Sequence, residues 1–346
     1  MLPYLLFFLL SIGQTFSSPM NIQERWSSVS DPLIMNLNAE TRLFALPESG
    51  QAKKKNHFWS GDYWPLNHGL INFRWNASEN FPKKSPTFNE LKMMNQLEMA
   101  QLSPAEKFDI LNARYDYPLR GEVEKKSNPH AEDWEGICHG WAPASMNHEE
   151  PIPKVLKNPH GLLVPFGSSD IKGLLSYYYA YPYQIANSHQ VGTRCEETNE
   201  CQKDLNAGAF HIIITNKIGL EGVGLIADVA QFSEVWNHPI FSYDSRISTK
   251  PKGPQSNSAP GTTRTVQVDT TITYAVETGN YWEPVSNSSR GHVKQTEFRY
   301  TLEIDLYGQV IGGEWISKNR PDFLWTKPRP ENFTGNFARL SELLND

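Results

Sequence analysis

The sequence is poor in cysteine, has no block of one charge, and after its N-terminus has no long hydrophobic run. Among 346 residues there are 3 cysteines, and the formal net charge is −6. Nucleic-acid binding needs clustered Lys and Arg, whereas the lysine runs at 53–55 and 83–84 are short and isolated. The composition therefore argues against nucleic acid as a partner. No later segment approaches the roughly 18 apolar residues that span a bilayer, so we expect no membrane segment in the mature chain.

The N-terminus carries a short apolar run that ends in small residues. We predict a signal peptide over residues 1–18, cut near Ser17–Ser18, and hence a secreted, extracellular protein. In a bacterium, the periplasm or the cell surface are alternative locations. An uncleaved anchor is the competing interpretation of this run, because no Lys or Arg precedes it.

Export to an oxidising compartment determines how the cysteines are interpreted. Cys195 and Cys201 flank a short polar stretch, and we expect them to form a disulfide. Metal binding by this pair is the alternative, but no CxxC spacing or histidine cluster supports it. The acidic residues at 196–197 leave calcium binding as an alternative, although no EF-hand pattern is present. We therefore predict no cofactor, and Cys138 is left as the free thiol.

The rest of the chain divides into a polar segment and one main domain. Residues 19–56 are predicted to form a loosely structured polar arm, and residues 57–346 a catalytic domain. Helical spacing over 87–101 and a capping box from Ser103 to Glu106 predict helices in its first half. Alternating apolar residues over 266–276 and 298–306 predict antiparallel strands in its second half. The fold class is therefore α+β, with the helices first in sequence.

Cys138 is the strongest candidate for a catalytic residue. It lies between Gly136 and Gly140, where a loop is expected to turn into a helix, and two tryptophans flank the segment. The unpaired amides and the positive end of a helix dipole stabilise a thiolate at such a position. The alternative is a small buried hydrophobic residue, which is the commoner role of a lone cysteine.

A cysteine nucleophile needs a base, and the base needs an orienting group. His211 and Asp228 lie in two short apolar runs, which we interpret as adjacent buried strands that place the carboxylate beside the imidazole. The order Cys, His, Asp is that of papain-like enzymes. Asn237 is the rival orienting group, and a structural core histidine is the alternative role for His211.

An oxyanion also needs hydrogen-bond donors, and one of them is the backbone amide of Cys138. Papain-like enzymes supply a glutamine six residues before the nucleophile. Here that position is Glu132, which cannot donate when ionised. Trp134 is the remaining candidate for the second donor.

The segment 134–145, Trp-Glu-Gly-Ile-Cys-His-Gly-Trp-Ala-Pro-Ala-Ser, resembles the nucleophile segment of the transglutaminase elicitor family of oomycetes and some marine bacteria. Shorter segments are similar to the same family and keep its order: 62–65, 103–109, 227–229 with 234–237, and 312–315 with 321–325. The resemblance implies a secreted acyltransferase with a partly papain-like core and Cys138 as nucleophile. The catalytic roles of His211 and Asp228 are inferred from their placement in the sequence. The resemblance favours Asp228 over His211, because the family relies on aspartate more than on histidine.

This resemblance implies a protein-glutamine γ-glutamyltransferase. The enzyme would pass the acyl group of a protein glutamine through a cysteine thioester to a lysine or another amine, so its partners would be proteins that present Gln and Lys. A secreted papain-like cysteine peptidase or deamidase is the first alternative, because it uses the same thiol chemistry. A non-catalytic surface or recognition protein that keeps the fold is the second.

Overall fold

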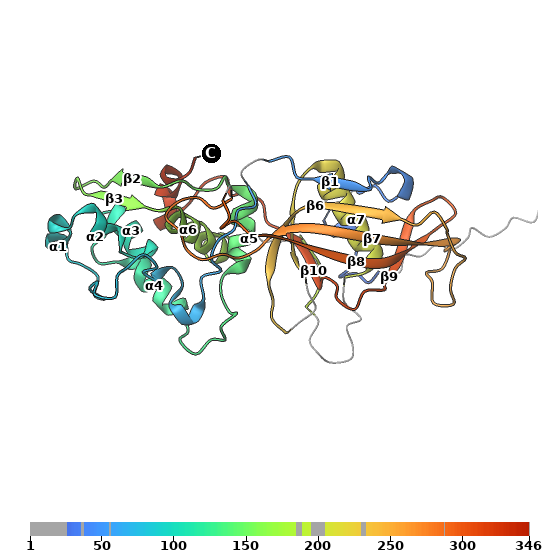
Figure 1. The fold of residues 1–346 in the computed structure, drawn as a ribbon, viewed down its shortest axis with the longest axis horizontal. Coiled ribbons are helices and arrows are strands. Elements are labelled where there is room, and N and C mark those ends of the chain that lie inside the picture. Colours follow the sequence, from blue (N-terminus) through green and yellow to red (C-terminus); the bar gives the residue numbers. More distant parts are fainter. Residues whose placement is uncertain are drawn as a thin grey trace, which may run out of the picture.

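The computed structural model describes residues 26–35, 38–54, 57–184, 189–194, 205–229, 233–286 and 288–345. The predicted signal peptide and the predicted Cys195–Cys201 disulfide lie outside these residues. The molecule is elongated, with most of its helices at one end and a long antiparallel sheet at the other (Figure 1). The predicted α+β class is confirmed.

The α-helices of the helical end are α1 (Phe88–Met93), α2 (Gln96–Ala100), α3 (Pro104–Leu111), α4 (Pro118–Lys126) and α6 (Ser168–Ala180), and a hairpin of β2 (Lys154–Lys157) and β3 (Leu163–Phe166) packs with them. Three 3-10 helices, at Leu66–His68, Leu70–Asn72 and Gly335–Leu343, also belong to this end. The segment predicted as one helix over 87–101 is two, because the Asn95 side chain accepts the backbone N–H of Glu98 at 3.0 Å and starts a new helix. The predicted capping box before α3 is confirmed: Ser103 and Glu106 bond each other's backbone N–H.

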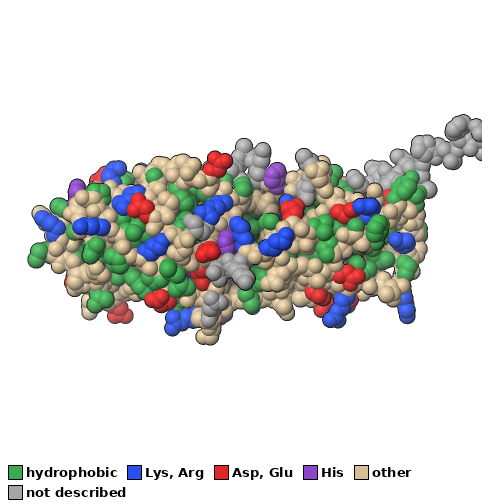
Figure 2. Space-filling model, turned by 90° about the horizontal axis from the view of Figure 1, so that it is seen from above, with side chains coloured by type: hydrophobic (Ala, Val, Ile, Leu, Met, Phe, Trp, Pro, Cys, Tyr) green, Lys and Arg blue, Asp and Glu red, His purple; other side chains and the backbone are tan. Residues whose placement is uncertain are grey.

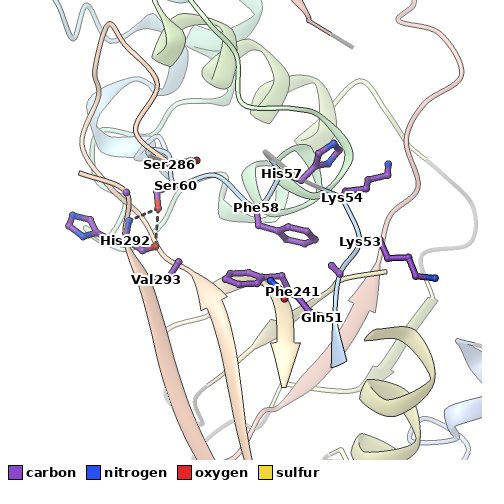
Figure 3. A pocket seen from close by; sticks show the side chains of 12 residues that line it. Gln51, Lys53, Lys54, His57, Phe58, Ser60, Phe241, Ser286, His292 and Val293 are labelled. Carbon is purple, nitrogen blue, oxygen red and sulfur yellow. Dashed lines mark hydrogen bonds between the residues drawn. The ribbon is translucent and has the colours of Figure 1, made fainter. Parts of the chain in front are cut away.

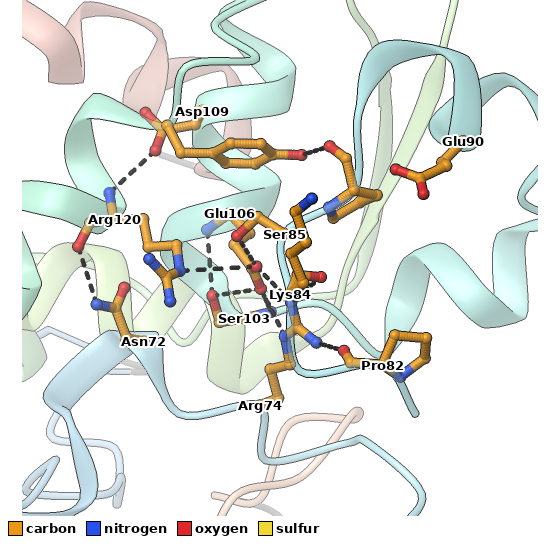
Figure 4. A network of polar contacts seen from close by, with 12 residues as sticks. Asn72, Arg74, Pro82, Lys84, Ser85, Glu90, Ser103, Glu106, Asp109 and Arg120 are labelled. Carbon is orange, nitrogen blue, oxygen red and sulfur yellow. Dashed lines mark hydrogen bonds and ion pairs between the residues drawn. The ribbon is translucent and has the colours of Figure 1, made fainter. Parts of the chain in front are cut away.

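A buried polar network holds the start of α3 (Figure 4). The Glu106 side chain is 1% exposed and receives hydrogen bonds from Ser103, from Ser85 and from Arg74, whose Nε lies 2.7 Å away. Asp109 accepts the backbone N–H groups of residues 119 and 120 at 3.0 Å, in the first turn of α4. The network thereby ties α4 and the preceding loop to α3.

The sheet has the strand order β4-β10-β5-β6-β7-β8-β9, and β1 adds to β6. Its strands are β1 (Ser49–Gln51), β4 (His189–Gly192), β5 (Leu225–Asp228), β6 (Asn237–Ile247), β7 (Arg264–Ala275), β8 (Val293–Ile304), β9 (Val310–Trp315) and β10 (Phe323–Thr326). The two alternating runs predicted as strands are β7 and β8, which pair antiparallel along their full length. Gly308 turns β8 into β9 with a φ of 82°, which a residue with a side chain adopts rarely.

The apolar run predicted as a strand carrying His211 is instead a helix, α7 (Ala207–Ile214), followed by a π-helical turn (Thr215–Glu221). Asn206 caps the helix by accepting the Gly208 backbone N–H at 2.8 Å. Every residue of α7 is buried, so its sequence lacks the polar face that reveals a helix. A short, wholly apolar run does not distinguish a buried helix from a buried strand.

Part of the segment expected to be a loose arm packs against the sheet. Met35 and Leu46 are 7% and 5% exposed and belong to the sheet's hydrophobic core. β1 pairs with β6, and the Asn216 side chain bonds the backbone of Glu40 in both directions. The segment looks polar in sequence because only a few of its side chains pack against the sheet, whereas many of the others are exposed. The division of domains at residue 57 stays a prediction.

One helix, α5 (Cys138–Asn147), lies where the two ends of the molecule meet (Figure 1). Ala142 and Met146 belong to the core beneath the sheet, whereas Cys138 and Trp141 belong to the core of the helical end. α5 therefore packs into both cores. The papain-like element of the fold stays a prediction.

The surface shows no large region of one charge on the face seen in Figure 2, where acidic and basic side chains are interspersed. Within the described ranges, no helix combines the length and the apolar composition needed to cross a membrane.

Candidate active site

Cys138 is the first residue of α5, and the loop before it is fixed by backbone hydrogen bonds. The N–H of Ile137 donates to the Tyr63 carbonyl at 2.7 Å, and the N–H of Leu66 donates to the Glu135 carbonyl at 2.9 Å. A Cβ at Gly136 would lie 2.5 Å from the Tyr63 carbonyl oxygen, so only glycine allows this close approach. Gly136 is thus required for structure, because it allows the loop before Cys138 to pack directly against residues 63–66.

The thiol is held by the start of β6. The Asn237 side chain donates from Nδ2 to Cys138 Sγ at 3.6 Å, and Sγ lies 3.7 Å from the Val235 carbonyl oxygen, its acceptor. The indole Nε1 of Trp325 on β10 donates to Asn237 Oδ1 at 2.8 Å. Because the indole nitrogen can only donate, it fixes the amide with its NH₂ group toward the sulfur.

Asp228 is brought to the same place by the strand register. It lies directly opposite Asn237 in the antiparallel pair of β5 and β6 and is 1% exposed. Opposed residues in such a pair have Cβ atoms about 5 Å apart. The Asp228 carboxyl group is therefore on the strand next to Asn237, at the position directly across from the amide that contacts the sulfur.

The environment raises the pKa of the Cys138 thiol above its ordinary value. Burial is the main cause, and the negative charges of Glu277 and Asp228 act in the same direction. The N–H groups of Asn237 lower the pKa but are outweighed. The expectation of a thiolate stabilised at the helix N-terminus is therefore wrong, because burial and two nearby carboxylates oppose the helix dipole. The raised pKa favours the neutral thiol at pH 7, so a nucleophilic attack by this sulfur would require a proton acceptor.

This direction predicts the pH dependence of alkylation. Since only the thiolate reacts, carboxamidomethylation of Cys138 by iodoacetamide is expected to be slow at pH 7 and to accelerate through pH 9 without reaching a plateau there. Mass spectrometry of the peptide that contains residue 138 measures the rate, with free cysteine as the reference. A rate that is high and flat between pH 6 and 8 would contradict the raised pKa.

Cys138 opens into a cavity of about 280 Å³, which Trp134, Cys138 and Asn237 line together with Leu66, Glu135, Gly136, His139, Tyr181 and Val235. Three of the residues predicted from sequence are thus brought together. A groove of about 750 Å³ lies near the other end of α5, where the rings of Phe58 and Phe241 face each other (Figure 3). Its lining contains neither cysteine nor carboxylate. The cavity at Cys138 is therefore the candidate active site.

The structure does not bring His211 to this site. Its Nδ1 bonds the Tyr300 hydroxyl at 2.8 Å beneath the sheet, and no described residue bonds its Nε2. α7, which carries it, lies farther along the long axis than α5 (Figure 1). Burial lowers the pKa of His211 to about 4, so the ring is neutral at pH 7. The predicted Cys–His–Asp arrangement required His211 on a strand beside Asp228, and its helix places it elsewhere.

Two features of the site were missed by sequence reasoning. Trp325 belongs to a segment already noted for its resemblance, yet its contact with Asn237 spans 88 positions and has no local signal. His238 lies next to Asn237, and its Nε2 is 3.3 Å from Glu277 Oε2. A histidine beside a candidate amide on an apolar strand is a signal that could have found this pair.

No group of three or more potential metal-ligating side chains comes together in the part of the chain that the structure describes. The absence of a cofactor, and the question of calcium, stay predictions.

Comparison with known proteins gives two findings. The model of the family described as "Transglutaminase elicitor" matches residues 122–342. The fold is similar to that of the GP42 transglutaminase from Phytophthora sojae, with a TM-score of 0.67 and 23% sequence identity over 93% of this chain and 98% of that one. No curated protein sequence matches. The family match covers most of the chain, including Cys138, Asp228, Asn237 and Trp325, and this chain therefore belongs to the transglutaminase elicitor family.

Proposed function

We propose that this protein is a secreted protein-glutamine γ-glutamyltransferase. The observation that carries the proposal is the thiol at the first residue of α5, held by the Asn237 amide inside a cavity, in a member of this family. The fold of the GP42 transglutaminase supports it at the level of architecture. The N-terminal apolar run supports secretion.

In the first half-reaction, the Cys138 sulfur attacks the carboxamide carbon of a protein glutamine. The thiol proton passes to Asp228, the carboxylate opposite Asn237. The C–N bond then breaks, the nitrogen takes the proton from Asp228, and ammonia leaves. The product is a thioester between the glutamine acyl group and Cys138. This role replaces the imidazole with a carboxylate as general base.

The oxyanion that forms during attack needs donors near the sulfur. The first backbone N–H groups of a helix have no partner within the helix, and Cys138 begins α5. Its own N–H therefore serves as one donor, and Asn237 Nδ2, which already lies 3.6 Å from Sγ, serves as another. Trp134 lines the cavity and helps to exclude water from the thioester.

In the second half-reaction, a lysine amine attacks the thioester carbon. The C–S bond breaks, one amine proton returns to Cys138 and the isopeptide is released. Water in place of the amine gives deamidation.

The proposal is tested with the full-length secreted protein, N,N-dimethylcasein as glutamine donor and a biotinylated pentylamine as acceptor. We expect amine incorporation together with release of ammonia. Ammonia release without incorporation would identify a deamidase. Cleavage of casein with neither product would identify a cysteine peptidase and overturn the proposal.

The choice of base gives a separate prediction. Asp228→Asn keeps the shape of the side chain and removes the proton acceptor, so kcat/KM for amine incorporation is expected to fall by about 10²- to 10⁴-fold. His211→Gln, which is remote from the sulfur, is expected to keep its activity per folded molecule within about threefold. Circular dichroism gives the folded fraction of each variant. The opposite pattern, with His211→Gln inactive and Asp228→Asn active, would restore the imidazole as base.

A further inference from the structure

A second cavity, of about 450 Å³, lies on the other side of the segment that contacts the thiol. It is lined by Asp228, Val229, Ser233, Glu234, Trp236, His238 and Tyr274. Along the segment 234–238 the lining alternates. Val235 and Asn237 line the cavity of Cys138, whereas Glu234, Trp236 and His238 line the second cavity. One extended segment thus separates two cavities that share no lining residue.

Two substrates must reach one sulfur in acyl transfer. After the first half-reaction the acyl chain stays attached to Cys138 and occupies the cavity through which it entered. The acceptor amine therefore needs a separate approach. Asp228 lines the second cavity and lies directly opposite Asn237, whose amide contacts the sulfur. The charges of Glu277, which faces His238, and of Asp228 both raise the pKa of the Cys138 thiol.

The outer part of the second cavity has the chemistry that a lysine side chain requires. Glu234 is exposed, and its Oε2 accepts the Trp236 indole N–H at 2.9 Å. That bond holds a carboxylate at the edge of an aromatic ring, and Tyr63 packs against the ring with a centroid distance of 5.1 Å. A carboxylate binds the ammonium group, and an aromatic face binds both the cation and its alkyl chain.

The inner part contains a histidine that is able to accept a proton. His238 is 7% exposed, and its Nε2 faces the Glu277 carboxylate at 3.3 Å. A carboxylate only accepts hydrogen bonds, so Nε2 carries the hydrogen and the lone pair is on Nδ1. This Nδ1 is buried and has no hydrogen-bond partner among the described residues. The ring packs against Tyr274 and Trp141, with centroid distances of 5.1 and 6.4 Å, but these contacts do not satisfy the polar Nδ1 atom.

We propose that the second cavity is the binding site for the acceptor amine, a primary alkylammonium such as the lysine side chain. This inference rests on the proposed acyl-transfer function. Glu234 and Trp236 hold the ammonium group, and His238 removes one proton from it. The neutral nitrogen attacks the thioester carbon and the C–S bond breaks. The second proton goes to the Cys138 sulfur, and the proton on His238 is released to solvent.

The test measures how the acyl-enzyme partitions between amine and water. The ratio of amine incorporated to ammonia released is determined with a biotinylated pentylamine, which is cationic, and with hydroxylamine, which is largely uncharged at pH 7. For Glu234→Gln we expect this ratio to fall about fivefold for the cationic amine, and for Glu234→Lys about tenfold or more. With hydroxylamine the ratio is expected to change less than twofold in both variants.

Glu79 supplies the matched control, because it is exposed and lies in the helical end. Glu79→Gln and Glu79→Lys make the same changes of charge and are expected to leave both ratios at the wild-type value. Unchanged ratios in both Glu234 variants, or equal losses with both amines, would overturn the acceptor site. Failure of the proposed function gives a different result, because the wild-type protein would then release no ammonia. That result would overturn both the acyl-transfer function and the acceptor site.

Discussion

Cys138→Ala is expected to reduce both ammonia release and amine incorporation to the rate without enzyme. Every bond change in the proposed reaction passes through the sulfur, so no other group in the cavity substitutes for it. Cys138→Ser is expected to be equally inactive, because a hydroxyl is a far weaker nucleophile than a thiol in an environment that already disfavours the anion of the thiol. Both products are measured at equal enzyme concentration under the conditions of the wild-type assay.

The loss is expected to occur without unfolding. Deleting one buried sulfur costs about 1 kcal/mol or somewhat more, and Asn237 keeps its bond from Trp325 in the variant. Thermal denaturation checks this expectation. The double variant Cys195→Ala with Cys201→Ala is the control, since it removes the other two cysteines and is expected to keep the wild-type kcat. Retained activity in Cys138→Ala, with loss in the double variant, would move the nucleophile to the 195–201 segment.

The position of Cys138 at the start of a helix and the main sheet could be predicted from the sequence because their signals are local. Glycines on both sides of Cys138 and a capping box before α3 act over a few residues, and β7 and β8 show the two-residue alternation of half-buried strands. The resemblance of segment 134–145 added the family. Each of these features is readable in a window shorter than fifteen residues.

The partners of Cys138 could not be predicted with the same success, because they depend on contacts between distant segments. The run that carries His211 is buried on all sides, so it lacks the period that separates helix from strand. The contact of Asn237 with the sulfur spans 99 positions, and that of Trp325 with Asn237 spans 88. The direction of the thiol's pKa was also missed, because burial is a property of the fold and not of the segment.

Gly140→Ala is expected to lower the free energy of unfolding by about 3 kcal/mol or more. A Cβ at this position would lie 2.0 Å from the carbonyl oxygen of Ser176 and 2.9 Å from the Cβ of Ala180. Both atoms belong to α6, and the oxygen is backbone, so no side-chain rotation relieves the contact. The two helices must move apart, which opens gaps in a densely packed core. Urea denaturation measures the change.

Gly121→Ala in α4 is the matched control, because no heavy atom lies within 4 Å of the added Cβ. It is expected to stabilise the protein by about 0.4–1 kcal/mol, since alanine loses less backbone entropy than glycine on folding. A Gly140→Ala variant as stable as the wild type would contradict the close contact between α5 and α6.

The same substitution links stability to activity, because Gly140 lies two positions after Cys138 on α5. A shift of α5 away from α6 changes the distance from Sγ to Asn237, and a displacement of about 1 Å at a reacting atom costs about 10²-fold in rate. The folded fraction of Gly140→Ala is therefore expected to have a lower kcat than the wild type, whereas Gly121→Ala keeps it. The Cys-His-Gly sequence thus combines the proposed nucleophile with the glycine that allows α5 to pack closely against α6.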